Sequence, residues 1–302
     1  LRIRWDPREA LFEVEPLPGA RVECRLVTVD SPAHEPPLTG PARVPPGVCV
    51  AVGERALLGL ELNERLLADP ELMGLRGQSQ PICTLRDTIR SLADFSGSIC
   101  LTGPTGSGKE RVAQALHEQS ARAAGPFGRI NCSTLRGALL ESTLFGHRKG
   151  AFTGAVSAEQ GLFVESDGGT LLLDEWTELP LNAQPRLLRA LQEREIRAVG
   201  APHPRPVDVR VIGATNRDPE AEVQAGRLRA DLFHRLATHL VHVPPLAERR
   251  FDVPELFVGF LAELRDAHPE LGWLWAQEPT RPPGLRLQLV VQLMRRGWPG
   301  NV

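Results

Sequence analysis

The chain has 302 residues, of which 42% are hydrophobic and 24% are charged, and its formal net charge is -2 at pH 7. This composition is that of a globular protein with one large domain and smaller ones beside it, and the charge offers no general attraction to nucleic-acid phosphates. No apolar run reaches the roughly 20 residues of a membrane helix, and the first residues lack a signal-peptide pattern, so we expect a cytoplasmic protein with no membrane partner.

Residues 1–68 contain short β-prone runs, RVECRLVTV and GVCVAVG, that are separated by Pro-rich turn stretches. This pattern predicts a small β-rich module. The cysteines are scattered through the chain, without CxxC or Cys/His ligand spacing, so we expect reduced thiols and no zinc site or disulfide framework. They are Cys24, Cys49, Cys83, Cys100 and Cys132.

Residues 74–247 alternate helical and strand patterns. Helical spacing begins at Ile82, and strand candidates follow at SICLTG, GRIN, TLLLDE, VDVRVIGATN and HLVHV. Such alternation predicts an α/β fold with a parallel sheet covered on both faces by helices. Residues 248–302 show helical segments only, FDVPELFVGFLAEL and LRLQLVVQLM, which predict a small helical lid.

The stretch GPTGSGKE lies between the strand candidate SICLT and the helical pattern RVAQALHEQ, which is the context of a phosphate-binding loop. Glycines let the backbone wrap phosphates, the N–H groups and the helix N-terminus hold them, and Lys109 reaches the β- and γ-oxygens. The flanking elements make a chance glycine turn a poor alternative. Glu110 stands where Ser or Thr usually ligates Mg²⁺. The residues expected to bind ATP are Gly103, Pro104, Thr105, Gly106, Ser107, Gly108, Lys109 and Glu110.

Two later strands end in polar side chains at the expected ligand edge of the sheet. In GGTLLLDE, Asp174 is predicted to hold Mg²⁺ together with water, and Glu175 to polarise the attacking water. An acidic turn that caps a strand is the alternative, and the pure apolar strand argues against it. Asn216, at the end of RVIGATN, could orient the water or sense the γ-phosphate, although Asn also favours turns.

The segment ESTLFGHRKGAFTGA contains the hexapeptide GAFTGA, whose residues are Gly150, Ala151, Phe152, Thr153, Gly154 and Ala155. We expect a tight, mobile loop with Phe152 and Thr153 exposed at its tip, and an amphipathic surface loop with a buried Phe is the alternative. The hexapeptide resembles the signature of bacterial sigma-54-dependent transcriptional activators. From Gly74 to Val302 the chain is similar to their AAA+ ATPase domain, through RINC, GGTLLLDE, GATN, RADLFHRL, VPPL and WPGNV.

This resemblance implies a ring, usually a hexamer, with ATP between neighbouring subunits and GAFTGA loops that engage sigma-54 RNA polymerase holoenzyme at a central pore. Asn131 of RINC matches the residue that couples Glu175 to the nucleotide state, and Asn216 matches the first sensor. Arg229 and Arg235 match the pair proposed to reach a neighbour's γ-phosphate, for which a guanidinium fork is suited. Outside the family context, two arginines in surface salt bridges would be the simpler interpretation.

The chain departs from the family pattern at several positions. Ala198 and Ala247 replace usual basic residues, and Leu162 and Val164 stand where the pattern has Arg and Glu, which could weaken coupling between subunits. The chain starts without Met and stops at WPGNV, so it looks like an excerpt whose lid is truncated before the second-sensor arginine. DNA contact is expected only through the family's helix-turn-helix, which is not in this chain.

We predict an ATP-hydrolysing activator that remodels sigma-54 closed complexes, with a non-hydrolysing ATP-binding scaffold ring as the alternative. A generic P-loop kinase or helicase would leave GAFTGA unexplained. PPGVCVAVGERALLGLEL has a likeness to the last strands of a forkhead-associated domain. The absence of a Gly-Arg and Ser-x-x-His constellation keeps an unrelated β module as the alternative.

Overall fold

In the computed structural model, the chain forms two compact units. The structure describes residues 2–6, 11–16, 24–27, 37–44, 48–52, 56–60, 74–134, 137–152, 155–268, 292–294 and 296–301. One unit consists of Leu1–Leu72, Arg76–Thr84 and Leu246–Pro299, and the other of Met73–Leu75, Leu85–Pro245 and Gly300–Val302.

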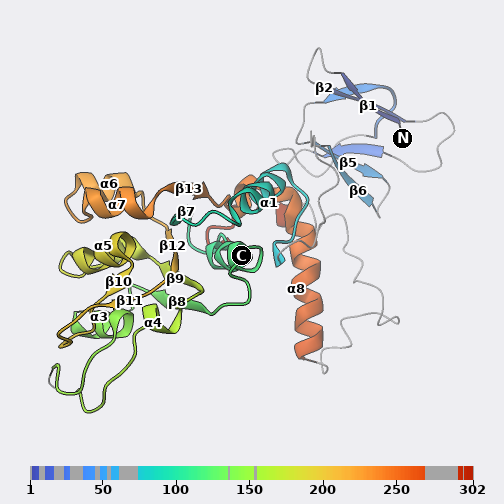
Figure 1. Cartoon of the computed structure of the whole chain (residues 1–302). Helices are drawn as coiled ribbons and strands as arrows, with labels where there is room; N and C mark the ends of the chain where they lie inside the picture. Colours follow the sequence, from blue (N-terminus) through green and yellow to red (C-terminus); the bar gives the residue numbers. More distant parts are fainter. Residues whose placement is uncertain are drawn as a thin grey trace. The chain divides into compact units, whose positions relative to one another are not determined.

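The second unit is built on a five-stranded parallel sheet whose strands are labelled in Figure 1. Its order is β13 (His239–His242), β7 (Ile99–Thr102), β12 (Arg210–Thr215), β9 (Thr170–Asp174) and β8 (Phe127–Asn131). These bounds confirm the predicted strands. The inner strands β7, β12 and β9 are mostly apolar and buried, as a parallel strand covered on both faces requires, whereas the edge strands β8 and β13 carry more polar and exposed residues.

Helices cover both faces of this sheet, as predicted. They are α2 (Lys109–Glu118), α3 (Ala138–Phe145), α4 (Leu162–Glu165), α5 (Gln184–Glu193), α6 (Pro219–Gln224) and α7 (Ala230–Leu236), with a short 3₁₀ turn at Trp176–Glu178. Side chains alternate along β12, so Arg210 bonds the carboxyl end of α2 on one face, while Gly213 faces Leu236 of α7 on the other. The larger apolar cluster lies on the α5–α7 side and includes the fully buried Trp176.

Two further elements lie outside the five-stranded sheet. A hairpin of two-residue strands, β10 (Glu195–Ile196) and β11 (Arg205–Pro206), follows α5 directly. Helix α1 (Gln80–Leu92) precedes β7, and its residues fall in both units. The Asp252 carboxylate accepts hydrogen bonds from the backbone N–H groups of Gln78 and Ser79, each at 2.8 Å, just before this helix begins.

In the described part of the first unit, six strands form two antiparallel sheets. One sheet is β1 (Arg2–Asp6), β2 (Leu11–Glu15) and β4 (Ala42–Val44), and the other is β3 (Cys24–Val27), β5 (Val48–Val52) and β6 (Ala56–Leu60). Val14 and Val50, both fully buried, belong to one apolar cluster that draws on both sheets. The β-rich module is therefore confirmed, and the forkhead-associated likeness stays a prediction.

The same unit holds α8 (Val253–Ala267) after two 3₁₀ turns, Leu246–Glu248 and Arg250–Asp252. Val253 and Leu256 of α8 pack with Leu293 and Met294, so the predicted lid has an apolar core of its own. Most of the second predicted lid helix, LRLQLVVQLM, lies outside the described residues. No helix in the described ranges has both the length and the apolar character needed to span a bilayer.

Candidate functional site: a phosphate loop facing a carboxylate edge

The loop between β7 and α2 has the backbone that its glycines predict. Gly103, Gly106 and Gly108 have φ angles of 153°, 75° and 99°, a region that side chains with a Cβ rarely adopt. Lys109 begins α2, is largely buried, and its Nζ donates to the carbonyl oxygens of Gly103 (2.9 Å) and Pro104 (3.3 Å). The ammonium is therefore held over the loop backbone, and the N-terminus of a ten-residue helix opens beside it.

Strand register brings the predicted polar residues to the same edge. Asn131 at the end of β8 pairs in register with Asp174 at the end of β9. The Asn131 amide donates to Asp174 Oδ2 at 3.1 Å. The sequence implied a pairing of Asn131 with Glu175, whereas in this structure its amide contacts the preceding carboxylate, because the register places those two ends opposite each other.

The electrostatics of Asp174 suit a bound cation. Burial raises the pKa of Asp174, and nearby Lys109 opposes the rise. A half-buried carboxylate whose charge is disfavoured by burial gains from a neighbouring divalent ion, and its oxygens are the hard ligands that Mg²⁺ prefers. The residues present thus fit a magnesium ion with Asp174 and water as ligands. No group of three or more His, Cys, Asp or Glu side chains forms a metal cluster in the described part of the chain.

Glu175 has a backbone conformation that is unusual for a residue with a side chain. Its φ of 50° and ψ of 42° are left-handed, which costs on the order of 1 kcal/mol outside glycine and is found most often at functional sites. Its Oε2 accepts a hydrogen bond from the backbone N–H of Asn216 at 3.1 Å. The Asn216 side chain in turn donates from Nδ2 to Thr105 Oγ1 at 2.9 Å. The phosphate loop, β9 and β12 are therefore joined by direct contacts.

Glu110, the departure within the phosphate loop, forms an ion pair with Arg129 of β8. Both side chains are mostly exposed, at 55% and 69%, so this pair contributes little to stability. Arg129 was not among the predicted site residues. Its spacing from Asn131 could have identified it, because residues two apart on a strand lie on the same face.

The two arginines expected to act on a neighbouring subunit are exposed and held by local partners. Arg229 precedes α7 and donates from Nη2 to Asp231 Oδ2 at 2.8 Å. Arg235 donates from Nη2 to the Leu191 carbonyl at 2.9 Å. Among the described residues, no hydrogen bond or ion pair joins either arginine to the phosphate loop or to the carboxylate edge.

Backbone hydrogen bonds join the residues on either side of the GAFTGA segment, which we call the loop base. His147 and Glu159 exchange two backbone hydrogen bonds of 3.0 Å, which bring the two ends of the loop together. The Arg148 N–H donates to the Val199 carbonyl at 3.0 Å, and the Val199 N–H donates to Gly146 at 2.8 Å. The loop base is thus bonded to the segment that follows β10.

The tip differs in part from the prediction. The Gly150 N–H donates to the Ala155 carbonyl at 2.9 Å, which brings the first and last residues of the hexapeptide together. Phe152 was expected to be exposed, and this is wrong for the present structure: the ring is half-buried, with its centroid 5.0 Å from that of His147. Aromatic rings are stabilised by packing against one another, and the ring of His147 lies five residues earlier in the chain. Thr153 and Gly154 lie outside the described residues.

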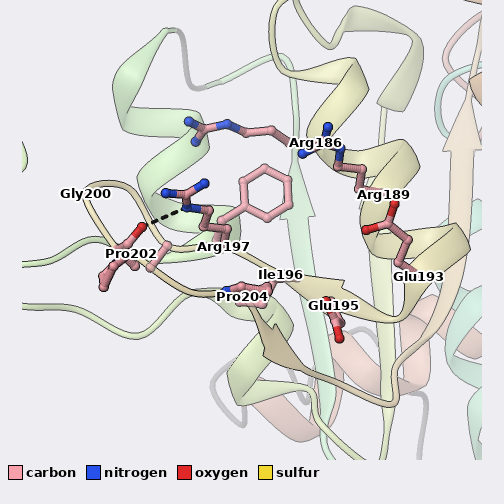
Figure 2. A pocket seen from close by; sticks show the side chains of 12 residues that line it. Arg186, Arg189, Glu193, Glu195, Ile196, Arg197, Gly200, Pro202 and Pro204 are labelled. Atoms are coloured by element: carbon pink, nitrogen blue, oxygen red, sulfur yellow. Dashed lines mark hydrogen bonds between the residues drawn. The ribbon is translucent and has the colours of Figure 1, made fainter.

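A pocket of about 700 Å³ lies beside the segment that carries the loop base. Figure 2 shows Arg186 and Arg189 from α5 and Arg197 from the following loop around it. Ala198 also lines it, at a position where the family pattern has arginine. Its lining residues include none from the phosphate loop or the carboxylate edge, so it is separate from the nucleotide site.

A glycine loop that wraps a helix N-terminus, with carboxylates at the end of a neighbouring parallel strand, defines a P-loop nucleotide-binding protein. Residues 75–242 match the Sigma-54 interaction domain, and the chain belongs to this family of AAA+ P-loop proteins.

Curated relatives agree with this assignment. The chain is 46% identical over 226 residues to the regulatory protein LuxO of Vibrio cholerae, which covers 75% of this chain and 41% of LuxO. It is 48% identical over 190 residues to the response regulator PilR of Pseudomonas aeruginosa, covering 63% of this chain and 43% of PilR. The chain therefore spans less than half the length of these relatives.

Solved structures agree as well. The crystal structure of NtrX from Brucella abortus in complex with ADP has a TM-score of 0.65 and 36% identity, and the match covers 75% of this chain and 47% of NtrX. The AAA+ fold predicted from the sequence is confirmed.

Proposed function

We propose that this chain binds ATP with Mg²⁺, hydrolyses it, and uses the cycle to remodel a sigma-54 RNA polymerase closed complex. One observation carries the proposal: the phosphate loop, the Asp174–Glu175 edge and Asn216 meet through direct hydrogen bonds. These are the groups that phosphoryl transfer to water requires, namely a phosphate cradle, a metal ligand and a base.

Each residue has a distinct role in the proposed reaction. Lys109 would leave its loop carbonyls and bind the β- and γ-phosphate oxygens. Asp174 and water would hold Mg²⁺, which neutralises charge on the phosphates when bound. Glu175 would take a proton from the attacking water, whose oxygen forms a bond to the γ-phosphorus as the bond to the bridging oxygen of ADP breaks. Asn216 would orient that water.

The remaining ATP contacts would come from a second copy of the chain in a ring, with a hexamer as the expected assembly. Arg229 would exchange its exposed pair with Asp231 for the neighbour's γ-phosphate, at little cost because such pairs are worth about 0–1 kcal/mol. Arg235 would likewise leave the Leu191 carbonyl. Asn131 would report the nucleotide state by moving between Asp174 and Glu175.

The GAFTGA segment would contact sigma-54. In this hypothesis ATP binding releases Phe152 from His147 and presents it together with Thr153. Nucleotide states can drive this change only if they bind the two loop states with different affinity. The backbone hydrogen bonds of the loop base support the proposal, because they hold the chain on both sides of the hexapeptide.

A non-hydrolysing scaffold ring is the second candidate. Ala198 favours it, because the family's basic side chain is missing from the pocket beside the loop base. The complete set of Lys109, Asp174 and Glu175 argues against it. DNA binding through a helix-turn-helix outside this chain, a cytoplasmic location and the division at residues 68, 74 and 247 remain predictions.

ATP turnover against protein concentration tests the proposal. The wild-type protein, Glu175→Gln and Phe152→Ala should be compared, with Arg90→Ala as an exposed control outside the site. We expect turnover per subunit to rise with assembly, to disappear in Glu175→Gln with ATP binding retained, and to persist in Phe152→Ala with loss of sigma-54 binding. Nucleotide binding without turnover in the wild-type protein would favour the scaffold.

A further inference from the structure

Thr105, in the phosphate loop, is contacted by amides from two distant segments. Asn216 donates from Nδ2 to its hydroxyl at 2.9 Å, and Asn301 donates from Nδ2 to its carbonyl at 2.8 Å. The backbone N–H of Asn216 then donates to Glu175 Oε2 at 3.1 Å. A continuous line of hydrogen bonds therefore runs from Asn301 through the phosphate loop to the proposed base, within one compact unit.

The backbone before Asn216 is fixed without Thr105. β12 is the central strand of the sheet, and the Gly103 N–H donates to the Thr215 carbonyl at 3.3 Å. The hydroxyls of Thr215 and Thr177 share a buried hydrogen bond of 2.7 Å. What these contacts leave undetermined is the rotation of the Asn216 side chain, which is exposed.

The hydroxyl of Thr105 contacts that side chain. It is the one side-chain partner of the Asn216 amide among the described residues, and it leaves the Asn216 Oδ1 acceptor available for water. A β-branched side chain has few χ1 choices, so the hydroxyl is itself well oriented. Thr105 is exposed and adds nothing to a core, and phosphate binding in such a loop uses backbone N–H groups rather than this hydroxyl.

We propose that Thr105 is a positioning residue for hydrolysis: its hydroxyl fixes the Asn216 amide, so that Asn216 and Glu175 together frame the attacking water. This inference rests on the proposed ATPase function and adds a role to a residue that the sequence assigns only to ATP binding. The role acts on the chemical step, because the hydroxyl contacts Asn216 and not the loop's phosphate-binding N–H groups.

Isosteric and conservative variants test it. Thr105→Val removes the hydroxyl at nearly constant shape, and Thr105→Ser restores it. We expect kcat to fall about tenfold in Thr105→Val, the effect of one hydrogen bond that matters in the transition state. KM and the Kd for a fluorescent ATP analogue should stay within about twofold of the wild-type values. The melting temperature should change by no more than about a few degrees. Thr105→Ser should return kcat to within about threefold of the wild-type value.

A double-mutant cycle separates positioning from general loop support. If Thr105 acts through Asn216, Thr105→Val should have no further effect on kcat in an Asn216→Ala background. Wild-type kcat in Thr105→Val, equal losses in the Val and Ser variants, or an additive loss in the double variant would overturn the inference and leave the ATPase proposal intact. Absence of turnover in the wild-type protein would overturn both, with the failure assigned to the proposed function.

Discussion

Arg210 at the start of β12 ties two helices to the sheet. Its buried guanidinium donates to the carbonyls of Leu92 (2.7 Å), Ala93 (2.8 Å) and Leu116 (3.1 Å). These carbonyls belong to the C-terminal ends of α1 and α2, where the last turn leaves acceptors without intrahelical donors and the helix dipole favours a cation.

The size of the effect follows from these contacts. Arg210→Met keeps an apolar stem of similar length and removes three charge-assisted hydrogen bonds of about 1.5–3 kcal/mol each. Burial of the charge, which also lowers the pKa of Arg210, offsets several kcal/mol of this gain. We expect a net loss of about 3 kcal/mol in the free energy of unfolding. Arg210→Lys should lose about half as much, because an ammonium is a single point charge.

Hydrogen exchange of peptides from β12 and α2 against urea is the suitable assay, since two compact units need not unfold together. Arg189→Met is the control: it removes an exposed arginine from the same unit, and should change stability by about 0.5 kcal/mol or less. If Arg210→Met cost less than about 1 kcal/mol, or no more than the control, the helix-capping argument would be refuted.

Three further predictions follow from other contacts. Gly213→Ala should destabilise this unit by about 1–3 kcal/mol in urea unfolding, because a Cβ would overlap Cδ2 of the buried Leu236 and lie 2.9 Å from the buried ring of Trp176. Cys132, whose thiol pKa is raised by burial to about 12, should resist iodoacetamide at pH 8 until the protein unfolds; alkylation of the folded chain would contradict this. Arg122 lowers the pKa of Asp208, so Asp208→Asn should cost about 1 kcal/mol at pH 7, after screening of this exposed pair. The difference should shrink as the pH falls below the ordinary aspartate pKa of 3.8 and vanish once the pH is below the lowered pKa of Asp208 in the folded protein, and a pH-independent loss would exclude the ion pair as its cause.

Local sequence constraints account for the parts of the site that could be predicted. The phosphate loop is specified by glycines that adopt φ angles closed to other residues, and β9 by an unbroken apolar run that ends in two carboxylates. Each of these signals lies within one short segment. The phosphate loop and β9 could therefore be predicted from their own residues, without knowledge of the segments packed against them.

Contacts between segments could not be predicted in the same way. The bond from Asn131 to Asp174 depends on the register of β8 against β9. The three acceptors of Arg210 become neighbours only once the strand order is fixed. Phe152 was misplaced because a loop pattern does not reveal that His147 offers an apolar face. The β10–β11 strands are too short for a periodic signal.

The left-handed backbone of Glu175 places the stability of the folded chain and the proposed ATP hydrolysis in opposition. Glycine accepts φ of 50° without steric penalty, so Glu175→Gly would relieve strain in the folded chain while removing the carboxylate. A library selected only for heat resistance should therefore enrich glycine or asparagine at this position and accumulate inactive proteins. If the proposed ATPase function holds, selection for thermal stability in this chain must be combined with a screen for phosphate release, so that Glu175 is retained.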